Sequence, residues 1–394
     1  MRLSRIPQRV SNALASVAFA FSCPQGQHFR VFCWLLVTLI VSEGGAKLKA
    51  LTRLMPPSLA YWTVLRMMRS GYWDAAVLVD AISEAVLAIL PPPADSVVHL
   101  TGDSTVTERT GEKQPLARKT RPNEYAPYVF GQALVLMITQ WGSYRVPVRA
   151  AVVDPTITGH QNLLFRQMLQ DFVPPAWVKA VVVEADAAFA AKATLKLITE
   201  QGWGYVFGLA RTWKLVDGTH LRDVARHTTH ACYHRYVAYK PDSRRKCYWV
   251  FRRTARVRHL GHVTLLFSKR RQNDGPKRIK LIVTNLAEAT TTGTILSHYH
   301  RRWGVEVAFK ELKSGLHLGQ IQVTKEPERV ARGLLLPILA YLLLLRLYGR
   351  EFPAEHGVSI WQLKRRFTEE AYQEQYARSE QRWRKKLDQY RAAA

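Results

Sequence analysis

The spacing of hydrophobic and polar residues predicts several kinds of structure along the chain. Residues 1–92 carry helical patterns, and two of these flank the break "PPS" at positions 56–58. The two short helices suit a helix-turn-helix over residues 46–70, with Arg66 and Arg69 on the second helix. A helical hairpin packed on the core fits the same pattern equally well. The stretch "LPPPAD" then predicts the end of the helical region.

From residue 96 to 210 the pattern becomes a strand, a hairpin, a helix, a strand, a helix and a strand. We expect the first strand to end at Asp103, and the buried strand "WVKAVVVEAD" to end at Asp186. This order predicts an α/β (α+β) fold in which helices flank a mixed sheet. Short strand-like runs over residues 211–280 then predict a β-rich insertion.

The remaining chain is expected to complete the sheet domain over residues 281–350 and to end in a polar helical tail over residues 351–394. Charge is concentrated in the insertion, where residues 211–280 hold 19 Lys and Arg against 4 Asp and no Glu. The whole chain of 394 residues carries a net charge of +27, which predicts a polyanionic partner. A membrane surface would attract the same charge. A hydrophobic content of 47% excludes a disordered chain.

Cysteine usage argues against a disulfide framework, because the chain has only 4 cysteines. His230, Cys232 and His234 would share one face of a strand, and Cys247 could join them as zinc ligands. No CxxC or HxxxH spacing supports that alternative.

Three apolar segments need an interpretation before a membrane is excluded. The first, Met1 to Phe21, resembles a signal peptide but lacks a small-x-small cleavage site, so we expect a first helix. The second, Val31 to Val41, is too short to span a bilayer. Pro337 interrupts the third, over residues 333–349, which we expect to be a buried core helix. These features predict a cytoplasmic protein with no membrane partner.

The stretch "YHRRWGVEVAFKELKSGLHL", residues 299–318, is amphipathic if it forms one helix. At about 100° per residue, four polar residues fall within an arc of roughly 60°: Tyr299, Arg302, Glu306 and Lys313. Lys310 and Trp303 border this stripe. Part of the pattern is ordinary, because Glu306 and Lys310 have the spacing of a helical ion pair. That pair does not require a Tyr, an Arg and a second Lys beside it.

Carboxylates at strand ends suggest what Glu306 does. Asp103 and Asp186 each follow an apolar strand, and the ends of strands are where an open sheet presents ligands. Three clustered carboxylates repel one another unless a cation neutralises them. Mg²⁺ takes such oxygen ligands, and two Mg²⁺ ions can drive hydrolysis of a phosphodiester.

The spacing Tyr-x2-Arg-x3-Glu-x6-Lys over residues 299–313 matches the YREK signature, and the chain resembles DDE-type bacterial insertion-sequence transposases. Asp103, in "TGDST", resembles the first aspartate of that family's ribonuclease H-like core. Asp186, in "VVVEADAAF", resembles the second, with Phe189 at the usual aromatic position. Glu184 is a rival for the second aspartate and Asp154 for the first.

The resemblance implies roles for these residues. Asp103, Asp186 and Glu306 would be catalytic and would hold two Mg²⁺ ions, with Mn²⁺ as a possible substitute. The remaining residues of the stripe and its border would bind DNA: Tyr299, Arg302, Lys313, Lys310 and Trp303. Trp249, or as a second possibility Trp213, would stack on a flipped base, although a core or surface strand aromatic fits Trp249 as well.

The function that the resemblance implies is cut-and-paste DNA transposition. Residues 1–92 would bind the terminal inverted repeats as a helical DNA-binding region. A homodimer on double-stranded DNA would cleave the element's ends and join each 3′-hydroxyl to target DNA, in the bacterial cytoplasm at the nucleoid. The alternatives are a ribonuclease H-like nuclease, a non-catalytic sequence-specific DNA-binding protein and a membrane-surface protein.

Overall fold

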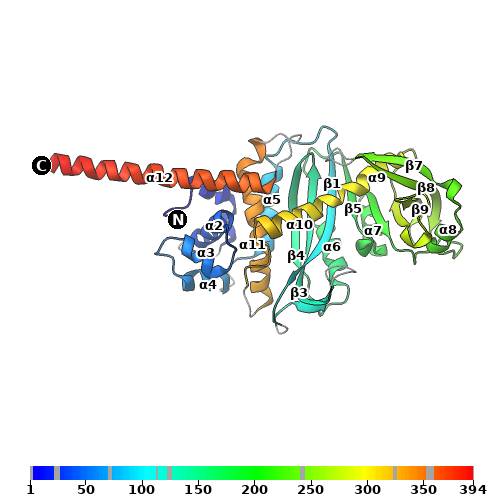
Figure 1. Cartoon of the computed structure of the whole chain (residues 1–394), viewed down its shortest axis with the longest axis horizontal. Coiled ribbons are helices and arrows are strands. Elements are labelled where there is room, and N and C mark those ends of the chain that lie inside the picture. The colour runs from blue at the N-terminus through cyan, green and yellow to red at the C-terminus, as the bar shows by residue number, and fades with distance from the viewer. Residues whose placement is uncertain are drawn as a thin grey trace.

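A ten-stranded mixed sheet forms the centre of the molecule, and helices flank it (Figure 1). This computed structural model describes residues 3–21, 27–69, 73–111, 114–121, 127–239, 245–322, 326–351 and 359–393. The predicted α/β fold with a mixed sheet is confirmed.

Nine strands form one path across the sheet, in the order β2-β3-β1-β5-β6-β10-β9-β8-β7, and β4 pairs with β3. β1 and β5 are parallel, as are β5 and β6, whereas the other pairs are antiparallel. The strands are β1 (Val97–Glu108), β2 (Ala117–Thr120), β3 (Val129–Trp141), β4 (Tyr144–Val152), β5 (Ala180–Ala185), β6 (Gly204–Leu209), β7 (His234–Tyr239), β8 (Arg245–Val257), β9 (Gly261–Lys269) and β10 (Lys280–Thr284).

The strands at the centre of the sheet are continuous apolar runs because both of their faces are covered. Val181, Val182 and Val183 of β5 are all buried, as parallel interior strands require. β3 and β4 form the predicted hairpin, and Gly142 supplies the positive φ of 53° at its turn. The basic strands β7, β8 and β9 extend the same sheet through β10, so the β-rich segment is continuous with the central sheet.

Helices before the first strand pack around one long apolar helix, α11. Asp74 caps the last of the early helices, accepting hydrogen bonds from the amides of Ala76 and Val77. The early helices are α1 (Gln8–Leu14), α2 (Gln27–Val41), α3 (Leu48–Leu54), α4 (Tyr61–Arg69) and α5 (Ala75–Leu87). The later helices are α6 (His160–Gln170), α7 (Lys192–Glu200), α8 (Leu221–His227), α9 (Thr292–Arg301), α10 (Trp303–Gly315), α11 (Pro327–Tyr348) and α12 (Ile360–Ala393).

Two helices at the C-terminal end differ sharply in burial. Among the described residues, one helix, spanning Pro327–Glu351, has the length and apolar composition to cross a membrane, but 83% of its apolar window is buried inside the protein. That burial agrees with the core helix expected there. In contrast, α12 packs on the body only near its start and then projects away from it (Figure 1).

Candidate active site

Asp103 and Asp186 lie on neighbouring parallel strands, at the point where the pairing of those strands ends. The last paired residues of β1 and β5 are Gly102 and Ala185, and each aspartate is the residue that follows. Residues in register on adjacent strands present their side chains to the same face. The two carboxylates therefore share one face of the sheet at the carboxyl end of the β1–β5 ladder.

The predicted end of the first strand at Asp103 was wrong. β1 continues to Glu108, and Asp103 is paired with Leu136 of the long strand β3. β5 ends after Ala185, because the chain then turns into a short 3₁₀ helix that Asp186 caps. Asp103 therefore lies where the pairing of β1 with β5 has ended and its pairing with β3 continues.

Backbone amides orient both aspartates. Asp103 Oδ1 accepts a hydrogen bond from the amide of Ser104 at 2.7 Å. Asp186 Oδ1 accepts one from the amide of Ala187 at 2.6 Å. Each bond fixes one oxygen of its carboxylate and leaves the other oxygen for another ligand.

The helix predicted over residues 299–318 is divided in two. α9 ends at Arg301 and α10 begins at Trp303, with Arg302 between them. The apolar side of α10 is buried as expected, since Val305 and Leu312 are completely inaccessible to solvent. The break leaves the guanidinium of Arg302 directed toward the sheet.

Arg302 links the helix to the first aspartate. Its Nη2 donates to Glu306 Oε1 at 2.7 Å, and its Nη1 lies 3.6 Å from Asp103 Oδ2. The carboxylate of Glu306 therefore pairs with Arg302. Among the ion pairs of the described residues, the expected Glu306–Lys310 pair does not occur.

Tyr299 and Asp186 meet above a glycine of β6. A Cβ added to Gly208 would lie 3.0 Å from Asp186 Oδ1 and 3.1 Å from the Tyr299 hydroxyl. Gly208 thus provides the space in which both groups approach the strand. Tyr299 is buried, and this burial raises the pKa of its hydroxyl, which stays neutral.

The electrostatics of the site show an excess of negative charge. The pKa of Asp103 is raised to about 6, mainly by burial and also by the nearby carboxylates of Glu306 and Asp186. The Ser104 amide and the Arg302 guanidinium act in the opposite direction. One arginine therefore does not neutralise the three carboxylates, and a hard divalent cation with oxygen ligands fits this donor set.

Comparison with known proteins agrees with this arrangement. Residues 102–343, more than half of the chain, match the family model of the transposase DDE domain. The chain belongs to the DDE transposase family. Members of this family use divalent metal ions, in agreement with the acidic character of the site. The search of curated proteins finds no match.

This DDE transposase is similar to a solved piggyBac transposase in a synaptic complex with hairpin DNA. The similarity covers 93% of the present chain and 77% of the piggyBac chain. The sequence identity is 10% and the TM-score is 0.49. A likeness of this degree transfers no residue role or partner.

The other predicted residues of the transposase lie in different settings. Lys313 Nζ reaches back to β1 and donates to the carbonyl of Val106 at 3.1 Å. Lys310 and Trp303 are exposed on α10, and Trp303 keeps 56% of its surface accessible. Trp249 lies half-buried in β8 against the core, and Trp213 also packs there.

Glu184, the rival for the second aspartate, is completely buried one step deeper on the same face. His99 Nδ1 lies 2.9 Å and His298 Nδ1 lies 3.3 Å from its Oε1, and these contacts hold the pKa of the carboxyl below its usual range against the effect of burial. Asp154 lies after β4 and is partly exposed, and its Oδ1 accepts hydrogen bonds from the amide and hydroxyl of Thr156.

The four residues considered for zinc do not assemble. His230 Nδ1 contacts the carbonyl of Gln272, and Cys247 accepts a hydrogen bond from Arg235. Within the described part of the chain, His99, Glu184 and His298 form the one group whose ligand atoms all lie within 4.8 Å of one another. Asp103, Asp186 and Glu306 are more widely spaced, with Arg302 between two of them.

Two residues near the site were not predicted from the sequence. Gly208 is one, and Lys280 at the start of β10 is the other, with its ammonium 4.8 Å from the centre of the Tyr299 ring. Burial lowers the pKa of Lys280, and the Asp186 carboxylate opposes that shift. Lys280 belongs to the basic stretch, but nothing local in the sequence places it beside Asp186.

Proposed function

We propose that this DDE transposase moves a bacterial insertion sequence of the YREK subclass by a cut-and-paste route. Asp103, Asp186 and Glu306 hold two Mg²⁺ ions, for which Mn²⁺ can substitute. The observation that carries the proposal is the register of β1 and β5, which sets Asp103 beside Asp186, together with the Arg302 bridge to Glu306. When bound, the ions supply charge neutralisation and activate the attacking oxygen at the scissile phosphodiester.

The protein's own residues bind and orient the DNA. Arg302 offers a planar fork that suits a phosphate, and binding a phosphate there would compete with its present carboxylate partners. Tyr299 offers a neutral hydroxyl beside Asp186. Lys313, Lys310 and Trp303 extend the binding surface along α10, and Trp249 remains the proposed platform for a flipped base.

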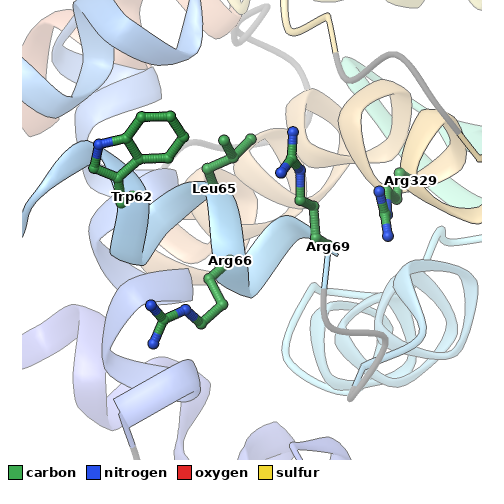
Figure 2. Close-up of a pocket in the computed structure, with 5 residues that line it drawn as sticks. All are labelled: Trp62, Leu65, Arg66, Arg69 and Arg329. Carbon is green, nitrogen blue, oxygen red and sulfur yellow. The ribbon is translucent and has the colours of Figure 1, made fainter.

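The N-terminal helices recognise the terminal inverted repeats. On α4 the apolar side is buried, whereas Trp62, Arg66 and Arg69 are exposed at helical spacing. With Leu65 and Arg329 of α11, these residues line a pocket of about 370 Å³, and none of the described residues that line it is acidic (Figure 2). A basic surface with an aromatic ring suits a nucleic-acid backbone and its bases.

The proposed role of each region follows the domain boundaries expected from the sequence. Residues 1–92 bind DNA, with a possible helix-turn-helix over 46–70. Residues 96–210 and 281–350 form the catalytic domain of ribonuclease H-like type. The basic insertion, 211–280, and the helical tail, 351–394, complete the chain. A homodimer acts on two DNA ends in the bacterial cytoplasm, at the nucleoid and without a membrane partner.

A joining assay tests this proposal. A labelled duplex that carries the element's end is incubated with the protein, a supercoiled plasmid and Mg²⁺, and the products are resolved on a gel. The proposal predicts free 3′-hydroxyl ends and their covalent attachment to the plasmid. Cleavage without joining would indicate a nuclease, and binding without cleavage would indicate a non-catalytic DNA-binding protein.

A further inference from the structure

A buried group of two histidines and one glutamate lies beneath the acidic residues and belongs to no step described above. His99 comes from β1, Glu184 from β5 and His298 from α9. Their side chains are 3%, 0% and 16% exposed. Three elements that are distant in the sequence thus bring ligand-type atoms within 4.8 Å of one another.

The charge of Glu184 requires a positive partner. A fully buried carboxylate is costly unless it is paired. Its hydrogen-bond partners among the described residues are the two imidazoles and the Thr101 hydroxyl, which donates to Oε2 at 3.3 Å. No Lys or Arg of the described residues forms an ion pair with it. The compensating charge must come from a protonated imidazole or from a bound cation.

The geometry of the group resembles that of a zinc centre. Both histidines direct Nδ1 toward the same glutamate oxygen, at 2.9 and 3.3 Å. A tetrahedral ion with bonds of about 2.0 Å separates its ligand atoms by about 3.3 Å. Two imidazole nitrogens and one carboxylate form a ligand set that zinc uses, and a water or the Thr101 hydroxyl can supply the fourth position.

We propose that His99, Glu184 and His298 bind a zinc ion that ties α9 to β1 and β5. The ion is structural, and it is distinct from the divalent ions assigned to Asp103, Asp186 and Glu306. His298 precedes Tyr299, and Glu184 lies two residues before Asp186. The zinc therefore fixes the helix that carries Tyr299 relative to the strands that carry the two aspartates. This inference does not depend on transposition being the activity.

Metal analysis of the full-length protein tests the proposal. The protein is purified, dialysed to remove loosely bound ions and digested in acid for elemental analysis. We expect about one zinc per chain. Glu184→Gln and His298→Gln should lose the zinc, whereas His300→Gln on the same helix should retain it. Asp103→Asn combined with Glu306→Gln should also retain it, because the acidic site is separate.

A second measurement uses only the wild-type protein, so it does not depend on whether the variants fold. Wild-type protein is freed of metal with a chelator and titrated with Co²⁺, which should give the visible absorption of a tetrahedral site at about one equivalent. Zinc addition should abolish that absorption and raise the melting temperature. Wild-type protein with neither zinc nor a Co²⁺ spectrum would overturn the proposal and leave a hydrogen-bonded cluster. Zinc lost from the Asp103→Asn/Glu306→Gln variant but kept by Glu184→Gln would also overturn it.

Discussion

Arg302 donates to Glu306 across 2.7 Å, and the same guanidinium reaches the first aspartate of the site. The positive charge of Arg302 has two effects in the proposed mechanism. It reduces the repulsion between Asp103 and Glu306 before DNA and metal arrive, and it presents a fork to a phosphate afterwards. The helix break at Arg302 gives it this reach.

Replacing Arg302 by lysine should therefore impair the reaction although the charge is retained. Lysine carries a single ammonium in place of the planar fork, so it cannot hold a phosphate by two parallel bonds. We expect cleavage to fall about tenfold or more, which corresponds to about 1.4 kcal/mol in the barrier. The rate of single-turnover cleavage of a duplex that carries the element's end measures this loss.

Arg302→Ala should also reduce the salt dependence of end binding by about one unit of slope, if the residue neutralises one phosphate. Arg301→Ala and Arg301→Lys are the matched controls, since they change the neighbouring arginine. An unchanged slope for Arg302→Ala would remove this residue from the phosphate-binding set.

Asp103→Asn should stabilise the metal-free fold at neutral pH. The pKa of Asp103 is raised to about 6 by burial, so the folded state holds its proton more tightly than the unfolded state does. Stability from this group is present below the unfolded pKa and is lost as the pH rises through about 6. Removing the charge should recover roughly 1–3 kcal/mol at pH 7.5.

Thermal melting in a chelating buffer at pH 4 and pH 7.5 tests that expectation. The gain of Asp103→Asn should appear at the higher pH and vanish at the lower one. Asp154→Asn is the control, because the Thr156 hydrogen bonds lower the pKa of that partly exposed aspartate. An equal gain at both pH values would show that the charge of Asp103 is not the cause.

Gly208→Ala should disable the site through a single methyl group. The added Cβ would lie 2.9 Å from the amide nitrogen of Ala187 and within about 3 Å of Asp186 and Tyr299. We expect cleavage to be lost and stability to fall by about 1–3 kcal/mol. Gly293→Ala on α9, whose added Cβ meets only ordinary contacts, should cleave normally. Normal cleavage by Gly208→Ala would contradict the close approach of Asp186 and Tyr299 to β6.

The Arg66→Ala/Arg69→Ala double variant should weaken end binding and lower its salt slope by up to about two. These two arginines line the same pocket as the exposed ring of Trp62 on α4. Arg365→Ala/Arg384→Ala removes the same charge from α12, where each arginine pairs with a glutamate, and should change little. Equal losses in both double variants would mean that only net charge matters.

Local sequence patterns were sufficient to predict some parts of the site and not others. The position of Asp186 at the end of a buried strand could be predicted, because a continuous apolar run ends there and small residues follow. Asp103 was placed on the correct strand, but the length of that strand depends on β3, which no local pattern reveals. The buried face of α10 follows from helical periodicity, whereas the break at Arg302 leaves that periodicity almost unchanged.

Long-range contacts explain the remaining differences. Gly208 is one glycine within an apolar strand, and its importance comes from Asp186 and Tyr299, which lie elsewhere in the chain. His99 is the one histidine of β1 and His298 is one of two on α9, and no spacing between them suggests a shared site. Their meeting at Glu184 depends on how α9 lies across the sheet.

The central claim is that Asp103, Asp186 and Glu306 form one metal-dependent active site. The most direct test is Mg²⁺-dependent cleavage of a duplex bearing the element's own end, with Glu306→Gln, Asp103→Asn and Asp186→Asn compared with the wild type. Asp154→Asn serves as the control. We predict that the three variants bind the end but lose cleavage, whereas wild type and Asp154→Asn cleave. Near-normal cleavage by any of the three would contradict the assignment of that residue.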